Sequence, residues 1–500
     1  MTAGIAPDEL ERFRAIIGRR LGLNVDESRM DSLASVLAKR IARSRGPGAR
    51  YLDALEVSRH TDELRALAAE LTVNETYFFR NPDQFRACAE LVIPERLAAR
   101  AAERRLNVLS AGCASGEEPY SLAILLREQL PDPSWQVSLR AFDLSPAMLA
   151  KAERARYSAW ALRETSAAVQ RRWFRNDGGE FVLHQAIREI PAFHESNLTE
   201  DDPRIWTPAQ YDVVFCRNVI MYLTAEAAEQ AVARIARSLA RGGYLFLGHA
   251  ETLRGLSLDF HLCHTHGTFY YRLKEASGAP ENRPSPRPEP ASPTIWNDTW
   301  LETIEHASLR IEALSKRSSE PQASGPEPPS PAEVRRDLGV ALELLERERY
   351  EEALSLLGDV RADARDPDAL LLHAVLLTHA GKLEAATAAC ASLLALDELN
   401  TGAHYVLALC CESAGDRQRA MNHDRMAVYL DPSFAMPRLH LGLMARRMDD
   451  RETARRELAQ ALMLLQREDA ARLLLFGGGF NRDTLTALCR AELSAVGGTA

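Results

Sequence analysis

The sequence changes character once, at a proline-rich stretch, and this change limits what either side of it can fold into. Residues 275–331 contain runs such as GAPENRPSPRPEPASP and SSEPQASGPEPPSP. Segments of this composition cannot bury enough apolar surface to offset the entropy lost on ordering. We therefore expect a linker between separately folded parts, in a chain whose 500 residues are too many for one core.

One segment inside this linker differs from its surroundings. Residues 294–317 read TIWNDTWLETIEHASLRIEALSKR, and their apolar side chains recur at spacings that would line one helical face. Two interpretations stay open, a transient helix within a linker and a docking segment.

Charge and hydropathy exclude several classes of protein. The chain has 61 Lys and Arg against 70 Asp and Glu, a formal net charge of −9, which disfavours nucleic acid as a partner. No apolar run reaches the ~18–20 residues of a membrane span, and the N-terminus lacks the apolar core of a secretory signal. The eight cysteines include no CxxC pair. We expect a cytoplasmic protein with reduced thiols and no direct membrane insertion.

After the linker, residues 332–500 are helical in pattern and repetitive. Alanines at 353, 386, 420 and 454 are spaced 33, 34 and 34 residues apart, and a glycine stands five residues before two of them. Asp-Pro pairs follow at 366–367 and 431–432. This period and punctuation are typical of tetratricopeptide (TPR) repeats, of which three to four fit between 335 and 466 before a capping helical tail. An ordinary helical bundle is the alternative.

The first 274 residues divide in two. Residues 1–72 have a helical pattern throughout. From residue 105 onward, apolar runs that suit strands alternate with helical segments. The expected strands are 106–111, 137–142, 211–216, 244–247 and 268–273, with a helix at 117–130. This alternation predicts an α/β, Rossmann-like doubly wound sheet.

A glycine-bearing loop follows the first of these strands. The sequence VLSAGCASGEEPYSLAILL runs from a strand into Gly112, through a short loop to Gly116, and into a helix. Glycines let a backbone approach a ligand closely, and the helix N-terminus offers unpaired N–H groups. Neither GxGxxG nor GKS/GKT is present, and Glu117 and Glu118 would repel a pyrophosphate.

The second strand ends at Asp143, which is where an acid accepts hydrogen bonds from ribose hydroxyls. A glycine loop and a ribose acid without phosphate-binding residues fit a nucleoside that carries a positive charge, such as S-adenosylmethionine. A capping role for Asp143 before the next helix is the alternative.

Five blocks in the N-terminal part carry a resemblance to a known family. They are LTVNETYFFRNPDQF (71–85), SAGCASGEEPYSLA (110–123), FDLSPAMLAKAERARYS (142–158), YDVVFCRNVIMYL (211–223) and LFLGHAETL (245–253). In this order, and over residues 5–274, the chain resembles the CheR-type chemotaxis receptor protein-glutamate O-methyltransferases. With its repeats it resembles the family's TPR-carrying branch.

The resemblance implies a domain plan and an activity. Residues 1–72 would be a helical substrate-recognition domain, and 73–274 the methyltransferase domain with a small antiparallel β-subdomain at about 171–195. The reaction would take a methyl group from S-adenosylmethionine, leaving S-adenosylhomocysteine, and make glutamyl methyl esters on the cytoplasmic helices of a methyl-accepting chemotaxis receptor. The repeats would bind an unknown protein partner or regulate the enzyme. The short turn RNDGGEF in the β-subdomain predicts no dependence on a receptor tail peptide.

The resemblance also implies site residues. The cofactor contacts are Asn74, Thr76 and Arg80 in the segment that closes over the cofactor, Ala111 and Glu118 at its methionine part, Asp143 at its ribose, Asn197 and Leu198 at its adenine, and Arg217 and Asn218 after the fourth strand. Arg80 and Tyr222 would be catalytic, because Arg80 can hold the substrate carboxylate and Tyr222 can orient it. A structural cation and a packing aromatic are the respective alternatives.

Basic residues gather in the N-terminal domain. Between residues 29 and 50 a single acid, Asp31, stands among six cations: Arg29, Lys39, Arg40, Arg43, Arg45 and Arg50. Of these, Arg29, Arg40 and Arg43 recur at helical offsets, and Arg29, Lys39, Arg40 and Arg43 are the predicted substrate-recognition residues. In the family the corresponding helix meets the acidic helix of the receptor, and complementary charge raises the encounter rate. The alternative is a solvated helix face.

Two further interpretations complete the expectations. The histidine-rich HLCHTHG (261–267) is expected to be a loop, and no metal is expected there or elsewhere. Two other functions remain open: a small-molecule or RNA methyltransferase on the same fold, and a scaffold that only senses the cofactor.

Overall fold

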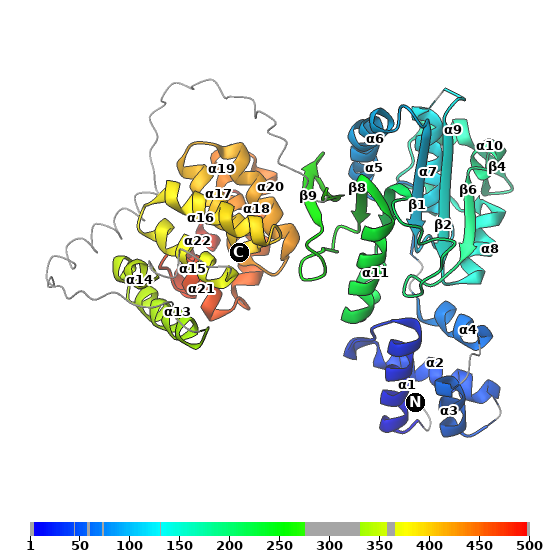
Figure 1. Cartoon of the computed structure of the whole chain (residues 1–500), viewed down its shortest axis with the longest axis horizontal. Helices are drawn as coiled ribbons and strands as arrows, with labels where there is room; N and C mark the ends of the chain where they lie inside the picture. Colours follow the sequence, from blue (N-terminus) through cyan, green and yellow to red (C-terminus); the bar gives the residue numbers. More distant parts are fainter. Residues whose placement is uncertain are drawn as a thin grey trace, which may run out of the picture. The chain divides into compact units, whose positions relative to one another are not determined.

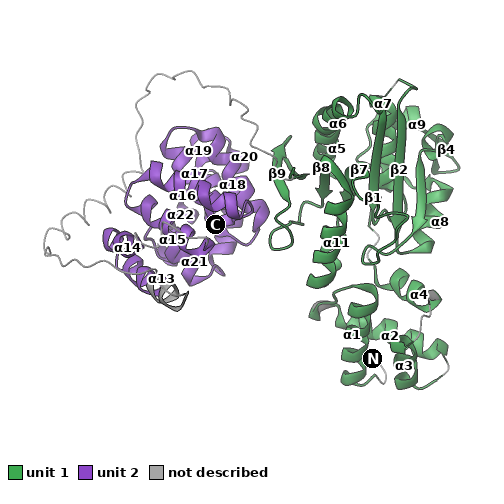
Figure 2. Cartoon of the chain, in the orientation of Figure 1, with its two compact units in different colours: residues 1–279 green, residues 280–500 purple. Residues whose placement is uncertain are grey.

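The chain folds into two compact units, residues 1–279 and 280–500 (Figure 2). The computed structural model describes residues 5–44, 46–57, 61–72, 75–130, 132–275, 331–357 and 366–497. The expected linker lies almost wholly outside these residues, as does the segment 294–317. None of the helices in the described ranges is long and apolar enough to span a bilayer.

The first unit begins with a helical domain, as expected. Its elements are α1 (Pro7–Leu21), a 3₁₀ turn η1 (Glu27–Arg29), α2 (Met30–Ser44), α3 (Gly48–Val57) and α4 (Thr61–Leu71). Apolar residues recur every three or four positions on these helices, so each presents one face to a shared core. Phe13, Ile16, Leu37 and Leu52 are fully buried in it.

A seven-stranded sheet forms the centre of the first unit, with strand order β6-β2-β1-β7-β8-β10-β9. Its strands are β1 (Arg105–Ala111), β2 (Gln136–Asp143), β6 (Pro191–Glu195), β7 (Tyr211–Cys216), β8 (Leu239–Leu247), β9 (Phe260–Thr265) and β10 (Thr268–Leu273). Neighbours from β6 to β8 are parallel, while β10 is antiparallel to β8 and β9. The predicted Rossmann-like class is confirmed. The strand order reverses between β1 and β7, where such sheets bind ligands.

Helices flank the sheet and shape its loop edge (Figure 1). They are α5 (Pro82–Ala87), a π-helical turn η2 (Cys88–Val92), α6 (Ile93–Ala99), α7 (Glu117–Gln129), α8 (Pro146–Arg154) and α11 (Ala225–Ser238), with short 3₁₀ turns η3 (Ala159–Leu162) and η4 (Ile220–Tyr222). All six residues of β7 are buried, as expected for a parallel strand covered on both faces.

The predicted bounds of the small antiparallel subdomain were wrong. Its sheet has the order β3-β5-β4, from β3 (Arg156–Tyr157), β4 (Phe174–Asp177) and β5 (Glu180–Leu183), with α9 (Ala167–Trp173) and α10 (Gln185–Arg188) beside it. Residues 191–195, assigned to it from sequence, form β6 and pair in parallel with β2 of the main sheet. The paired residues of β2 and β6 are 52 positions apart, so local sequence does not reveal the pairing.

The expectation that 261–267 forms a loop was also wrong, because most of it is the outer strand β9. His266 and Gly267 both have positive φ, 53° and 71°, and make the two-residue turn that joins β9 to β10. His261 and His264 point to opposite faces of the strand. Across the described residues, no group of three His, Cys, Asp or Glu side chains is placed to hold a metal ion.

The second unit is a stack of helical hairpins. They are α13 (Pro331–Glu346) with α14 (Tyr350–Leu357), α15 (Pro367–His379) with α16 (Leu383–Leu396), α17 (Thr401–Ser413) with α18 (Arg417–Leu430), and α19 (Ala435–Arg447) with α20 (Arg451–Leu465), followed by α21 (Ala470–Phe476) and α22 (Arg482–Ala495). The four regularly spaced alanines lie in the second helix of each hairpin and have no exposed surface. The TPR-type repeats are confirmed.

The turns inside the hairpins share a backbone conformation. Five residues before each buried alanine, φ is positive: 58° at Glu348, 71° at Gly381, 82° at Gly415 and 59° at Asp449. Glycine adopts this conformation freely, whereas Glu and Asp do so at some cost. The first and fourth hairpins therefore have the same turn conformation without the glycine that predicts it from sequence.

A buried ion cluster joins three helices of the repeats. The ring of His440 (α19) lies 2.7 Å from Asp424 (α18) and 2.7 Å from Glu412 (α17), with 4% of its side chain exposed. Burial lowers the pKa of His440, but the two carboxylates outweigh it and raise that pKa to about 10. The imidazolium therefore stays charged at neutral pH and lies between the fully buried Asp424 and the partly buried Glu412, which also pairs with Arg447.

Replacing this imidazolium should destabilise the repeats. In His440→Leu the fully buried Asp424 loses this cation, whereas Glu412 keeps its pairing with Arg447, and we expect the free energy of unfolding to fall by about 3–5 kcal/mol in denaturant titrations at pH 6.5. The ordinary pKa of the imidazole is 6.5. The contribution of the cluster is therefore fully present below pH 6.5 and is lost as the pH rises towards 10, so the difference should shrink over that range.

The matched control is His423→Leu. Burial lowers the pKa of His423 to about 4, so at neutral pH this substitution removes no charge. Equal losses in the two variants would contradict the role of the ion cluster.

Candidate active site

The loop after β1 is shaped by two glycines in the left-handed region. Gly112 has φ 73°, and a Cβ there would stand 2.5 Å from a methyl group of Val219. Gly116 has φ 94°, and its Cβ would stand 2.7 Å from that of Ala152. No other residue fits either position without displacing its neighbour. The loop therefore lies directly against the chain that follows β7.

Asp143 links the loops that follow β1 and β2. Its carboxylate accepts hydrogen bonds from the N–H of Ala114 and of Ser145, both at 2.8 Å. Burial raises its pKa, against the lowering effect of these backbone donors. The bond to Ala114 reaches across to the neighbouring strand's loop, which a cap of the following helix would not do. Asp143 also lines a cavity at this edge of the sheet.

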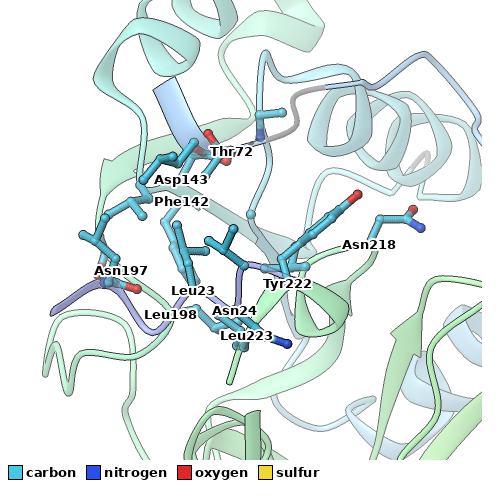
Figure 3. Close-up of a pocket in the computed structure, with 18 of the residues that line it drawn as sticks. Leu23, Asn24, Thr72, Phe142, Asp143, Asn197, Leu198, Asn218, Tyr222 and Leu223 are labelled. Atoms are coloured by element: carbon cyan, nitrogen blue, oxygen red, sulfur yellow. Dashed lines mark hydrogen bonds between the residues drawn. The ribbon is translucent and has the colours of Figure 1, made fainter. Parts of the chain in front are cut away.

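A cavity opens at this edge, between the sheet and the N-terminal domain, and it encloses about 830 Å³ when the space open to solvent is included (Figure 3). Leu23, Phe142, Leu198 and Leu223 give it an apolar wall. The buried side chain of Asn197 faces the same space and donates from Nδ2 to no other residue that the structure describes. This half of the site suits a flat, apolar ring system that can accept one hydrogen bond.

A second cavity of about 640 Å³ adjoins the first, and the two share Gly112, Ala114, Asn218 and Tyr222 as lining residues. Its wall is charged, with Arg80, Glu118 and Arg217 among the lining residues, beside Thr76. The site therefore has an apolar half and a charged half.

The charged half contains a buried pair with unused capacity. Nε of Arg217 lies 3.6 Å from Glu118, and Nη2 of Arg217 donates to the carbonyl of Arg80 at 2.6 Å. Ser110 donates to Glu118 at 2.8 Å. Burial raises the pKa of Glu118 and lowers that of Arg217, and each is opposed by the charge of the other. Nε and Nη1 of Arg217 have no hydrogen-bond partner in the described part of the chain, so they are donors that a polar ligand can use.

The segment that carries Arg80 is held in an uncommon conformation. Phe79 and Asn81 both have positive φ, 55° and 61°, which costs energy in residues other than glycine. Phe78 is fully buried and donates to the carbonyl of Ala161 at 2.9 Å, which anchors the segment. Arg80 itself donates to the carbonyl of Glu75 at 2.7 Å and lines the charged cavity.

Two of the predicted cofactor contacts, Asn74 and Ala111, are not among the described residues that line the two cavities. Asn74 lies outside the described residues, so its role stays a prediction. Ala111 is fully buried at the end of β1, and its side chain is absent from the cavity walls, while the next residue, Gly112, lines both cavities.

The N-terminal domain holds the segment that carries Tyr222. Leu23 and Leu223 form an antiparallel bridge, in which Asn24 donates to the carbonyl of Tyr222 at 2.7 Å. The Arg29 guanidinium lies 6.0 Å from the centre of the Tyr222 ring. The helical domain thus forms part of the site and fixes the backbone beside Tyr222.

Glu251 is a buried residue that sequence reasoning missed. Its carboxylate accepts four backbone N–H groups, from Asn218 at 2.6 Å, Val219 at 2.8 Å, Met221 at 3.2 Å and Gly248 at 2.7 Å. These bonds fix the chain after β7, which contributes three predicted site residues. The sequence did contain a signal for this role. Glu251 lies within LFLGHAETL, just after a buried strand, and a buried carboxylate needs hydrogen-bond partners.

The four predicted substrate-recognition cations do not form one exposed face. The Arg40 side chain is 8% exposed and lies 3.3 Å from Glu70, while Arg29 lines the cavity. Lys39 and Arg43 are exposed, 3.0 and 3.7 Å from the same Glu70. Glu70 belongs to α4, so the neutralising acid is absent from the local sequence in which the cations were counted.

Comparison with known proteins identifies a methyltransferase family and relatives of the chain. The family described as CheR methyltransferase, SAM binding domain, matches residues 74–269. The chain is 30% identical to "Probable biofilm formation methyltransferase WspC" of Pseudomonas putida, over 89% of this chain and 96% of that protein. It is 31% identical to "Chemotaxis protein methyltransferase 1" of Pseudomonas aeruginosa, over 53% of this chain and 98% of that protein. A solved TPR protein of Thermus thermophilus is 22% identical over 32% of this chain and 90% of its own, with a TM-score of 0.26.

Glu251→Gln should loosen the site without removing a residue from its wall. Bonds to a charged acceptor contribute about 1.5–3 kcal/mol each, and the amide cannot accept all four donors. We expect the Kd for S-adenosylhomocysteine, measured by calorimetry, to rise roughly tenfold or more. The matched control is Glu229→Gln on the exposed side of α11. An unchanged Kd in Glu251→Gln would refute the positioning role.

Proposed function

The chain belongs to the CheR methyltransferase family and its cofactor is S-adenosylmethionine, and from this premise we propose that it methylates glutamate side chains on the cytoplasmic helices of a methyl-accepting chemotaxis receptor. The observation that carries this proposal is the two-part site, in which an apolar cavity with Asp143 adjoins a charged one with Arg80, Glu118 and Arg217. A nucleoside with a charged tail and a carboxylate substrate need these two environments side by side.

We assign the parts of the cofactor to the two halves of the site. Asp143 would accept the ribose hydroxyls, and Leu198 with the unused Nδ2 of Asn197 would bind the adenine. Glu118 would bind the ammonium group of the methionine part, and the unused donors of Arg217 would bind its carboxylate. Thr76 and Asn218 complete the wall of the charged half. The orphaned buried donors on both sides support this assignment, because buried polar groups without partners are rare.

The reaction requires no proton transfer by a side chain of the protein. A glutamate carboxylate is already ionised at neutral pH, so no general base is required. When bound, the cofactor supplies an electrophilic methyl group, which a carboxylate oxygen takes while sulfur keeps the electron pair of the broken bond. Arg80 would hold that carboxylate by a charge-assisted hydrogen bond, and Tyr222 would orient it. Rate enhancement then comes from positioning in a site that excludes water.

The N-terminal domain supports a helical, acidic substrate. It borders the cavity through Leu23 and Asn24, and two of its predicted recognition residues, Lys39 and Arg43, are exposed. An acidic receptor helix could compete with Glu70 for these two cations. The contribution would be to the rate of encounter more than to affinity.

The repeats favour a chemosensory pathway of the kind named for the Pseudomonas putida relative. That protein matches over 89% of this chain, whereas the chemotaxis methyltransferase 1 of Pseudomonas aeruginosa matches over 53%. We propose that the enzyme acts in the cytoplasm, in a pathway that controls biofilm formation, and that its repeats bind a protein partner.

Arg80→Ala tests the catalytic assignment. With radiolabelled S-adenosylmethionine and receptor-containing membranes, the native protein should give an alkali-labile label on a receptor-sized band. The variant should transfer methyl groups roughly 10²-fold more slowly, because the reacting carboxylate is no longer held in place. The matched control is Arg86→Ala, which removes an exposed arginine that pairs with Asp83 on the same helix. Full activity in Arg80→Ala, or an alkali-stable label, would count against the proposal.

Asp143→Asn tests the cofactor assignment separately from catalysis. Loss of a charged acceptor should cost about 1.5–3 kcal/mol, so the Kd for S-adenosylhomocysteine should rise roughly 10- to 150-fold. Asp177→Asn, on the small antiparallel sheet, should leave that Kd unchanged. A Kd in Asp143→Asn within twofold of the native value would show that the ribose is bound elsewhere.

A further inference from the structure

One short helix of the second unit, α21, contacts the first helix of successive repeats (Figure 1). It packs against α13 and α15. The ring of Phe476, its last residue, lies 5.8 Å from Tyr405 of α17 and 5.1 Å from Phe434, the N-cap residue of α19. A single segment therefore touches the first-helix side of all four hairpins, which is the concave face of a TPR stack.

The side chains through which α21 contacts the repeats are apolar, and a glycine of the repeats leaves space for one of them. Leu473 and Phe476 are 8% and 7% exposed. A Cβ on Gly402 would stand 2.9 Å from the tip of the Phe476 ring and 2.9 Å from Leu371. Glycine within a helix costs about 0.5–1 kcal/mol relative to alanine, and its presence in α17 provides the space that Phe476 fills.

Charged groups fix the orientation of the helix. Arg472 of α21 pairs with Asp431, and its guanidinium lies 4.8 Å from the centre of the Phe434 ring. The buried carboxylate of Glu468, just before α21, accepts the N–H of Ala435 at 2.6 Å. A buried aromatic ring and an arginine that pack together in a groove resemble a protein–protein hot spot, where aromatic residues and arginine are enriched.

The helix that follows α21 is held to the repeats by contacts of its own. Beyond α21, α22 packs on α20, where Cys489 donates to the carbonyl of Leu458 at 3.1 Å, and Glu492 pairs with Arg446 of α19 at 2.6 Å. Three glycines, 477–479, separate α21 from α22, and Gly478 and Gly479 have positive φ. Arg482 at the start of α22 donates to the carbonyl of Glu468, so the part that can separate from α22 is α21 itself, between that contact and the glycine joint 477–479.

We propose that α21 is an internal ligand of the repeat groove, and that the groove's external partner is a protein helix with Leu and Phe anchors spaced as Leu473 and Phe476 are, together with an arginine placed like Arg472. This inference does not depend on methyl transfer. An internal segment acts at an effective concentration in the millimolar range. If the intrinsic Kd of α21 for the groove is ~10 μM, α21 lowers the apparent affinity of a competing helix about 100-fold. The partner must therefore bind the empty groove tightly enough to overcome this loss.

The test uses the full chain and a fluorescent peptide of residues 467–481. In Leu473→Ala/Phe476→Ala the internal copy loses its anchors, and the variant should bind the peptide at least tenfold more tightly than the native chain does. Two controls locate the binding. A peptide carrying the same two alanines should not bind, and adding Gly402→Met to the double variant should abolish binding by filling the seat. Equal affinity for native and variant chains, or no binding to either, would overturn the proposal.

Hydrogen exchange on the native chain gives a second measurement that needs no variant. Amide protons of α21 should exchange at least tenfold faster than those of α20 and α22, because α21 opens locally while the others remain packed. Addition of the Leu473→Ala/Phe476→Ala peptide should leave this rate unchanged. Equal protection of the three helices would show that α21 is an integral part of the repeat core, and would overturn the proposal.

Discussion

Two buried carboxylates hold the loops on which the active site depends. Asp143 accepts backbone N–H groups from the chain after β1 and β2, and Glu251 accepts four from the chain after β7 and β8. These loops have little regular structure to satisfy their backbone groups, and an unpaired buried N–H costs about as much as a lost hydrogen bond. The carboxylates replace that missing structure. They leave the ends of the strands open, so that Gly112, Ala114 and Asn218 can border both cavities.

The site is completed by a domain that lies far from the sheet in sequence. The bridge between Leu23 and Leu223 brings the helical domain against the chain that carries Tyr222, and the cavity wall is drawn from both. A substrate that binds the helical domain therefore acts on a surface that shares backbone hydrogen bonds with the site. With the proposed substrate, one contact area would both recognise a protein helix and position one of its side chains.

The features that the sequence predicts well are those with local causes. The strand–glycine–helix unit at 108–126 and the buried alanines of the repeats follow from short patterns, and the structure has both. The missed features depend on partners distant in sequence: β6 pairs with β2, Glu63 and Glu70 of α4 pair with the cations of α2, and Glu251 reaches back to Asn218. The strand β9 is an exception, because Gly267 after His266 was a local turn signal that the histidines obscured.

The two units use buried polarity in opposite ways. In the first unit, donors of Asn197 and Arg217 are buried beside cavities and remain unused within the described chain, a cost that a bound polar ligand would offset. In the second unit, the buried charge of His440 is balanced by Asp424 and Glu412, and α21 contacts the repeats through the rings of Phe476, Tyr405 and Phe434. A charged, small ligand suits the first environment, and a helix with apolar anchors suits the second. The first unit therefore offers donors to a small polar ligand beside its cavities, and the second unit offers an apolar seat to a helix.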